Sequence, residues 1–133
     1  MRDPNLASET LTHGVRVRVE PEYLPDQSEP SAGLWVHCYH VNIRNEGEAP
    51  VQLLSRHWII TNAEGKEEHV HGPGVVGMQP VIEPGRSFQY TSGCPLDTAV
   101  GSMHGSFQMV ARDGARFDAL IEPFTLADPL ALN

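Results

Sequence analysis

The stretch PVQLLSRHWIITN, residues 50–62, decides the fold expected of this chain. The tripeptide at residues 55–57 interrupts its apolar side chains, and most of the others are residues that strands prefer. Pro50 and the turn sequence NAEG at residues 62–65 bound the stretch. A strand that is apolar on both faces belongs in the interior of a sheet. We therefore expect residues 50–62 to form a central strand that is covered on at least one side.

The segments before this stretch alternate between polar and apolar residues, as strands with one buried face do. In residues 14–20 every second residue is valine, and we expect Pro21 and Pro25 to end this strand. A second strand is expected over residues 34–45. One face of it holds Trp35, His37, Tyr39, Val41 and Ile43. Because only NEGEAP, residues 45–50, separates it from the central strand, we expect the two to be antiparallel neighbours.

Four further short strands follow, and no segment shows a helical period over ten or more residues. They cover residues 67–71, 86–93, 105–113 and 116–124, with glycine and proline between them. About seven short strands in one chain predict an all-β fold, an antiparallel β-sandwich of the immunoglobulin or fibronectin type III kind. A small closed barrel is the competing geometry.

The length of 133 residues favours one domain, which we place at residues 14–127. Residues 1–13 are expected to be an N-terminal arm and residues 128–133 a C-terminal tail. The net charge of −8 argues against nucleic acid and against anionic membranes as partners. Because the sequence also lacks a long apolar run and an apolar leader, we expect a cytosolic protein, with Cys38 and Cys94 as free thiols.

The segment from Gly72 to Gly77 reads GPGVVG and matches the pattern GxGxxG. In dinucleotide-binding folds this pattern precedes a helix, but MQPVIEPG after residue 77 cannot form one. Two interpretations remain. The glycines meet steric demands between strands, or the loop forms a nest of backbone N–H groups that binds an anion. In the second case Arg56 could supply positive charge.

His69 and His71 are two residues apart and share one face of a strand with Glu67. Three such ligands would suffice for an open metal site, but the same residues could also be the polar outer face of an edge strand. The sequence shows no recognised catalytic signature around its serines and cysteines. We therefore expect no catalytic residues and no cofactor.

The sequence resembles the ApaG family of bacterial proteins from about Val15 to Ala127. The segments that carry the resemblance are PEYLPDQS, NIRNEG, PVQLLSRHWIITN, GPGVVGMQP and YTSGCPLDTAVGSMHGSFQM. The resemblance implies a fibronectin type III-like sandwich. It also implies a link to divalent-cation homeostasis, because the family name is often extended to "Co2+/Mg2+ efflux protein". Similar domains in eukaryotic F-box and polymerase-interacting proteins look like protein-binding modules, so the resemblance favours recognition over catalysis.

The family pattern falls on polar residues, on glycines and prolines, and on expected core residues of this chain. It covers Arg56, Trp58, Gly72, Gly74, Val75, Val76, Gly77, Pro80, Pro84, Gly85, Tyr90, Thr91, Ser92, Gly93, Gly101, Met103, Gly105 and Met109. We expect Trp58 and Tyr90 to pack in the core, with the Tyr90 hydroxyl bonded to backbone. His57, His69 and His71 lie outside the pattern, as do both cysteines.

Together these observations predict a non-enzymatic cytosolic recognition domain. It would bind a protein partner or a small anionic, phosphate-containing ligand. The expected contact residues are Arg56, Gly72, Gly74, Val75, Val76, Gly77, Thr91 and Ser92. The alternative is direct binding of a divalent cation by Glu67, His69 and His71. The sequence leaves a homodimer open.

Overall fold

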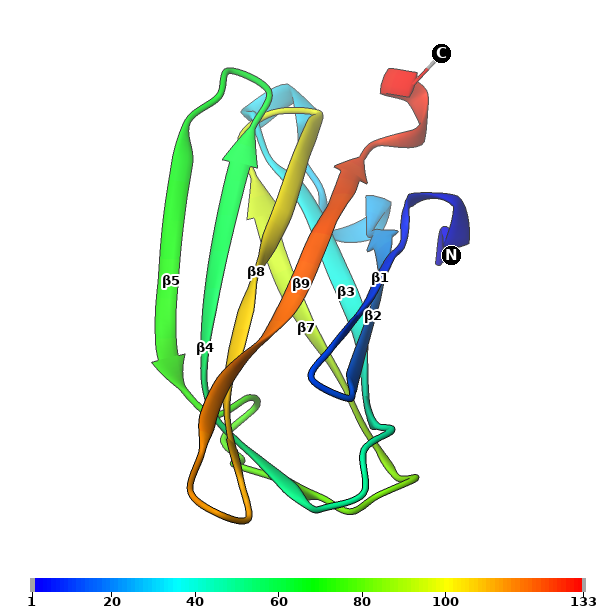
Figure 1. The fold of residues 1–133 in the computed structure, drawn as a ribbon. Helices are drawn as coiled ribbons and strands as arrows, with labels where there is room; N and C mark the ends of the chain where they lie inside the picture. Colours follow the sequence, from blue (N-terminus) through cyan, green and yellow to red (C-terminus); the bar gives the residue numbers. More distant parts are fainter. Residues whose placement is uncertain (1, 133) are drawn as a thin grey trace.

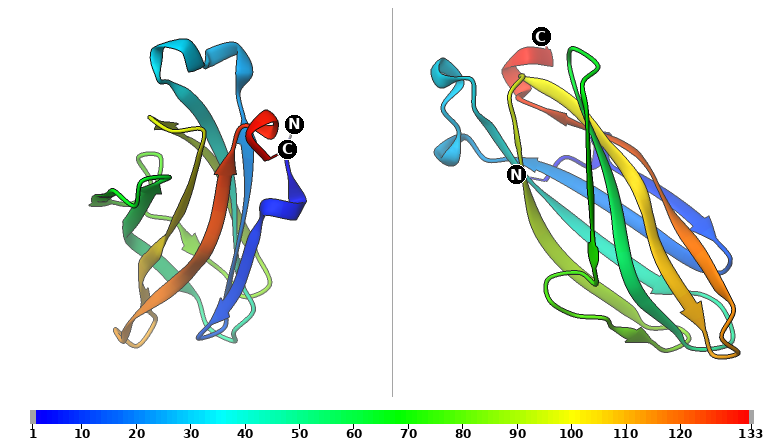
Figure 2. Two further views of the ribbon diagram at one scale, coloured as in Figure 1. Left: turned by 90° about the horizontal axis from the view of Figure 1, so that it is seen from above. Right: turned by 90° about the vertical axis from the view of Figure 1, so that its left-hand side faces the viewer.

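The chain folds into two antiparallel β-sheets packed face to face (Figures 1 and 2). The computed structural model describes residues 2–132, and nine strands lie within them. The first sheet has the order β1 (Ser8–Thr12), β2 (Val15–Tyr23), β3 (Trp35–Asn45) and β7 (Ser87–Leu96). The second has the order β5 (Glu67–Pro73), β4 (Val51–Asn62), β8 (Val100–Ala111) and β9 (Arg116–Ala127). The all-β sandwich expected from the sequence is confirmed.

Two short strands account for the difference from the expected seven. Strand β1 lies in the segment that the sequence assigns to an N-terminal arm, where it forms the edge of the first sheet. Strand β6 (Val81–Ile82) has two residues and pairs with the start of β4. The remaining regular structure is four 3-10 turns, at Pro4–Leu6, Pro25–Gln27, Pro30–Ala32 and Pro129–Leu132. No helix within residues 2–132 is long and apolar enough to cross a bilayer.

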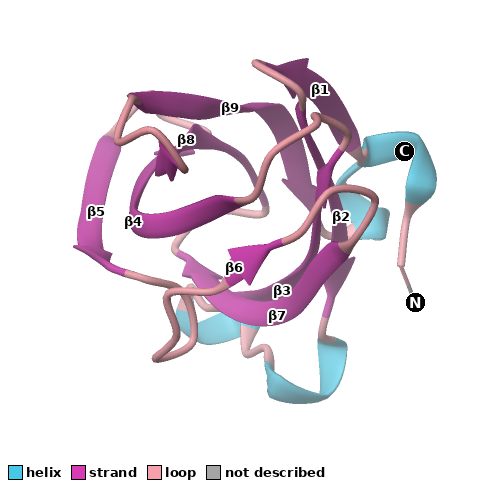
Figure 3. Ribbon diagram, turned by 60° about the horizontal axis from the view of Figure 1, so that its bottom comes forward, coloured by secondary structure: helices cyan, strands magenta, loops and turns pink. Residues whose placement is uncertain are grey.

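The two sheets meet along one side, where β9 lies beside β1 and β2 (Figure 3). The backbone N–H of Leu120 in β9 donates to the hydroxyl oxygen of Thr12 in β1. The opposite edge of the first sheet is β7, and the opposite edge of the second sheet is β5. In the sequence, the loop that follows β5 leads toward β7.

The central strand β4 supplies much of the core, as its sequence predicts. Val51, Leu53 and Trp58 are buried against residues of both sheets. A β-bulge between Leu53 and Ser55 adds one residue to β4 opposite β8 and shifts the alternation of its side chains. Beyond the bulge, Arg56 falls on the inward side with Trp58, and His57 falls on the outer side.

Strand β2 passes through Pro21 and ends at Tyr23, two residues before Pro25, so of the two prolines expected to end it Pro21 is wrong. The carbonyl of Pro21 accepts a hydrogen bond from the N–H of Asp3, on the side of β1. In an antiparallel strand the nitrogen of a residue points to the same side as its carbonyl. Strand β1 reaches only as far as Val19. The missing N–H of Pro21 therefore removes no bond from the ladder with β3.

Strands β3 and β4 are not neighbours, and the hairpin expected across NEGEAP is also wrong. β3 pairs with β2 and β7, whereas β4 pairs with β5, β6 and β8. The segment instead crosses from one sheet to the other, held by the buried side chain of Asn45. Its Nδ2 donates to the carbonyls of Ala49 (2.8 Å) and Ile82 (2.9 Å). Its Oδ1 accepts from the N–H of Gly47 (2.9 Å).

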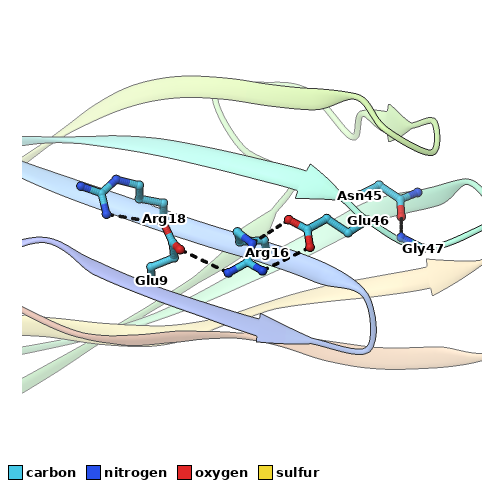
Figure 4. A network of polar contacts seen from close by, with 6 residues as sticks. All are labelled: Glu9, Arg16, Arg18, Asn45, Glu46 and Gly47. Atoms are coloured by element: carbon cyan, nitrogen blue, oxygen red, sulfur yellow. Dashed lines mark hydrogen bonds and ion pairs between the residues drawn. The ribbon is translucent and has the colours of Figure 1, made fainter.

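A network of ion pairs covers the outside of this crossing (Figure 4). Arg16 of β2 binds Glu46 through Nε (2.6 Å) and Nη2 (3.2 Å), and its Nη1 lies 3.2 Å from Glu9. Arg18 also approaches Glu9, at 3.5 Å. Because these groups are exposed to solvent, each pair contributes little to stability. The network orients the turn on β2 rather than holding the sheets together.

His37 of β3 has no exposed surface, and within residues 2–132 neither ring nitrogen has a hydrogen-bond partner. Its ring lies 5.2 Å from that of Tyr23. Burial lowers the pKa of His37 to about 4, against a smaller opposing effect of Asp128. The folded protein therefore holds this imidazole in its neutral form.

Stability should fall when the pH is lowered through the range in which His37 titrates. A histidine exposed to water has a pKa of 6.5, so between about pH 4 and pH 6.5 the unfolded chain binds more protons than the folded one. We expect a loss of about 2 kcal/mol from this residue between about pH 7.5 and pH 5. Urea denaturation across this range should show a flatter profile for His37→Phe. Parallel profiles of the two proteins would contradict the assignment.

Candidate functional site

The side chain of Arg56 connects strand β4 to the loop that follows β5. Its Nη1 donates to the carbonyl oxygens of Pro73 (3.1 Å) and Gly74 (2.8 Å). Gly72 lies directly under the guanidinium group, and a Cβ there would be 2.8 to 2.9 Å from its atoms. A side chain at position 72 would therefore displace the guanidinium group from its present position. Within residues 2–132, Nε and Nη2 of Arg56 have no acceptor, so three N–H groups are unused.

The rest of the glycine loop is a tight turn from Val75 to Met78. The N–H and carbonyl groups of these two residues exchange hydrogen bonds of 2.8 Å. Val76 and Gly77 both have positive φ angles, 43° and 79°, as the two central residues of a type I′ turn do. Val76 is β-branched, so its conformation is strained. Gly74 also has a positive φ, and a Cβ there would contact the carbonyl oxygen of Met78. Steric demands thus account for all three glycines.

Arg56 and the loop form one wall of a cavity of about 370 Å³ between the two sheets. Strands β3 and β7 form the other wall. The lining residues are Tyr39, Arg56, Pro73, Val75, Val76, Gly77, Tyr90 and Ser92. Tyr39 and Ser92 are direct partners in the β3–β7 ladder. The volume suits a small ligand.

Two tyrosines, Tyr39 and Tyr90, line this cavity. The hydroxyl of Tyr90 is buried and has no hydrogen-bond partner in the described part of the chain. Burial raises the pKa of Tyr90 and, to a smaller extent, that of Tyr39. Both phenols are therefore protonated at neutral pH and can donate hydrogen bonds. Together with the free N–H groups of Arg56, they form a set of donors that suits an anion.

The structure brings most of the predicted contact residues together but separates Thr91 from them. Ser92 lines the cavity, whereas Thr91 points to the opposite face of β7 because successive residues alternate. There its hydroxyl lies 2.8 Å from Nδ1 of His40. Sequence reasoning missed Tyr39, because only the register of β3 against β7 places it beside Ser92. It placed Tyr90 in the core with its hydroxyl bonded to backbone, but within residues 2–132 that hydroxyl has no hydrogen-bond partner.

The residues of the predicted metal site lie on the outer face of β5. Glu67, His69 and His71 are all exposed there. The ring of His57 approaches from β4, and its Nε2 lies 3.0 Å from Nδ1 of His69. One ring nitrogen of each of the three histidines lies within 4.8 Å of the others, but Glu67 is not part of this group.

A second group of ligand-type side chains, Glu22, Cys38 and His40, lies on the outer face of the first sheet. Nε2 of His40 is 2.8 Å from Glu22 and 3.6 Å from the sulfur of Cys38. Burial raises the pKa of the Cys38 thiol. Burial also raises the pKa of Cys94, to about 12. Both thiols are therefore protonated at neutral pH and are weak nucleophiles.

Residues 25–111, which include every residue that lines the Arg56 cavity, match the family model described as DUF525, the ApaG domain. The chain belongs to the ApaG family. It is 48% identical over 126 residues to Protein ApaG of Dechloromonas aromatica, covering 95% of this chain and 99% of that protein. It is 54% identical over 121 residues to Protein ApaG of Pseudomonas aeruginosa strain LESB58, covering 91% and 96%.

The fold is also that of a solved ApaG-type structure. A crystal structure of a Bordetella pertussis protein named ApaA superposes with a TM-score of 0.85 at 48% sequence identity. The match covers 86% of this chain and 94% of the other. The family resemblance seen in the sequence is thereby confirmed. The names of these ApaG relatives state no reaction.

Proposed function

We propose that this protein is a non-enzymatic recognition domain whose Arg56 cavity binds a small phosphate-containing anion. The observation that supports this most directly is the guanidinium group of Arg56. Two of its N–H bonds hold the glycine loop, and its three remaining N–H groups have no acceptor in residues 2–132. A group fixed in this way can bind a phosphate with little loss of side-chain entropy.

The neighbours of Arg56 are suited to the same ligand. Tyr90 and Ser92 line the cavity, and the buried Tyr90 hydroxyl has no partner in the described structure. A bound oxyanion would satisfy it, which removes the cost of leaving a buried donor unpaired. The net charge of −8 opposes anion binding at long range. The contact must therefore depend on these local donors.

Replacing Arg56 with glutamine should weaken binding of pyrophosphate, the probe, by about tenfold or more, because charge-assisted hydrogen bonds to phosphate are lost. Isothermal titration calorimetry measures the affinity. Ser92→Ala should cost only a few-fold. Arg112→Gln removes the same charge from an exposed turn far from the cavity and is the matched control.

Three outcomes of this experiment decide the proposal. Loss of binding in the Arg56 variant with an unchanged control supports it. Equal binding by both variants places the anion elsewhere, and absence of binding to the native protein rules out the small-anion function. In that last case, a protein partner captured from lysate by the native protein but not by Arg56→Gln would show that the cavity recognises a protein instead.

We further propose that this recognition takes place in the cytosol and underlies the link to Co2+/Mg2+ homeostasis that the family resemblance implies. A strain that lacks this gene should then tolerate added Co2+ differently from its parent. The native gene should restore the parental tolerance and the Arg56→Gln gene should not. Full rescue by the variant would separate the cavity from this cellular role.

A further inference from the structure

The outer face of the second sheet holds a compact group of imidazole rings. His57 of β4 and His71 of β5 are direct partners in the antiparallel ladder. Their rings stack with centroids 3.9 Å apart. His69 lies on the same face of β5, and its ring centroid is 5.2 Å from that of His57. Three histidines from two adjacent strands therefore share one small patch of surface.

The separation of the ring nitrogens matches what one metal ion needs. Nε2 of His57 and Nδ1 of His69 are 3.0 Å apart. Two nitrogens bound at about 2.1 Å in tetrahedral geometry are about 3.4 Å apart. One ring nitrogen of His71 also belongs to the group of three, one from each histidine, that lie within 4.8 Å of one another. Because His69 and His71 are exposed, their rings can rotate by the small amount that convergence requires.

Glu67 has a different part in this arrangement from the one that the sequence suggests. Its carboxylate lies 3.5 Å from Nε2 of His69, the nitrogen that faces away from His57. A metal-binding histidine commonly donates its second N–H to a carboxylate, which fixes the tautomer and the ring orientation. Glu67 is thus placed to orient His69 with Nδ1 toward the ion.

We propose that His57, His69 and His71 form a three-histidine surface site for a divalent transition-metal ion, with Glu67 as a positioning residue. Imidazole nitrogens favour ions such as Zn2+, Co2+ and Ni2+, whereas Mg2+ requires oxygen ligands. Three protein ligands leave a fourth position open to water or to another molecule. The site is separate from the Arg56 cavity, because the bulge in β4 turns Arg56 inward and His57 outward.

The test is titration of untagged, metal-free protein with Co2+ and Zn2+, followed by calorimetry and by the visible absorption of bound Co2+. We expect one ion per chain. His57→Ala and His71→Gln should each weaken binding by about a hundredfold or more, and Glu67→Gln by about tenfold. Because His71 and Glu67 are exposed, these two variants should keep the melting temperature of the native protein.

His40→Ala is the matched control, because it removes the histidine of the Glu22, Cys38 and His40 group and leaves the three-histidine patch intact. Unchanged binding in this control, together with loss in the His57 and His71 variants, supports the proposal. Loss in the control alone would assign the metal to the other group. Absence of binding to the native protein, or binding of Mg2+ as tightly as Co2+, would overturn it. Pyrophosphate binding should be unaffected in all four variants.

Discussion

Replacing Trp58 with alanine should lower the free energy of unfolding by about 4 kcal/mol, the largest loss that we expect from a single side chain. Trp58 is 2% exposed and is one of the largest buried side chains. Its ring makes edge-to-face contacts with Tyr39 (5.0 Å between centroids), Phe107 (6.1 Å) and Phe124 (6.0 Å). These partners come from both sheets, so truncation would leave a cavity that neither sheet can fill alone.

Urea denaturation of Trp58→Ala measures this loss, and Trp58→Phe is the control. The indole Nε1 has no hydrogen-bond partner in residues 2–132, so phenylalanine removes no hydrogen bond. It should cost less than half as much as alanine. A loss below about 2 kcal/mol for Trp58→Ala would mean that the core around it can collapse into the gap.

The second large effect should come from Gly105→Ala in β8, with a loss of about 3 kcal/mol. Gly105 is the ladder partner of Trp58. A Cβ at position 105 would contact the backbone carbonyl oxygen of His57 and would lie 3.2 Å from the Cα of Trp58. Both obstacles are backbone atoms of the central strand. They can move only if the β4–β8 ladder is distorted.

Gly93→Ala in β7 is the control for this substitution. A Cβ there would approach only the carbonyl oxygen of His37, at 3.7 Å, and Gly93 does not have a positive φ. We expect its stability to stay within about 0.5 kcal/mol of the native protein. Thermal and urea denaturation of both variants provide the comparison. Equal stability of the two would show that the β4–β8 ladder can adapt to the added methyl group.

Local pattern was sufficient to predict the secondary structure of several segments. In β2, Val15, Val17 and Val19 alternate with charged residues, and all three valines are buried. The apolar run of β4 lies inside the second sheet, between β5 and β8. Such predictions succeed because the choice between a buried and an exposed face is made within one strand, by residues two apart.

Alternation within single strands could not predict which strands pair with each other. NEGEAP has the composition of a hairpin turn, but the side chain of Asn45 bonds to Ile82 across the sandwich, and the segment changes sheets. Pro21 was expected to end β2 because proline lacks an N–H. The structure shows that β1 pairs with β2 only as far as Val19. Within residues 2–132, no strand therefore lies beside Pro21 on the side to which its N–H would point.

The candidate sites depend on a single backbone irregularity. Without the bulge after Leu53, strict alternation would place Ser55 and His57 inward and Arg56 outward. The sequence identified Arg56, the glycine loop and Ser92 as a set, and all of them contribute to one cavity or its support. It could not show that Tyr39 joins them or that Thr91 does not.

The amino-acid sequence by itself determined the sandwich class, the buried strands and the family, because periodicity and motif are properties of neighbouring residues along the chain. Only the tertiary structure decided which side chains meet. The bulge in β4, the β3–β7 register and the β4–β5 register bring Arg56 to Tyr90 and His57 to His71. Those registers are fixed by the packing of two whole sheets. Residues that are distant in sequence therefore become neighbours, and the local sequence pattern does not predict these contacts.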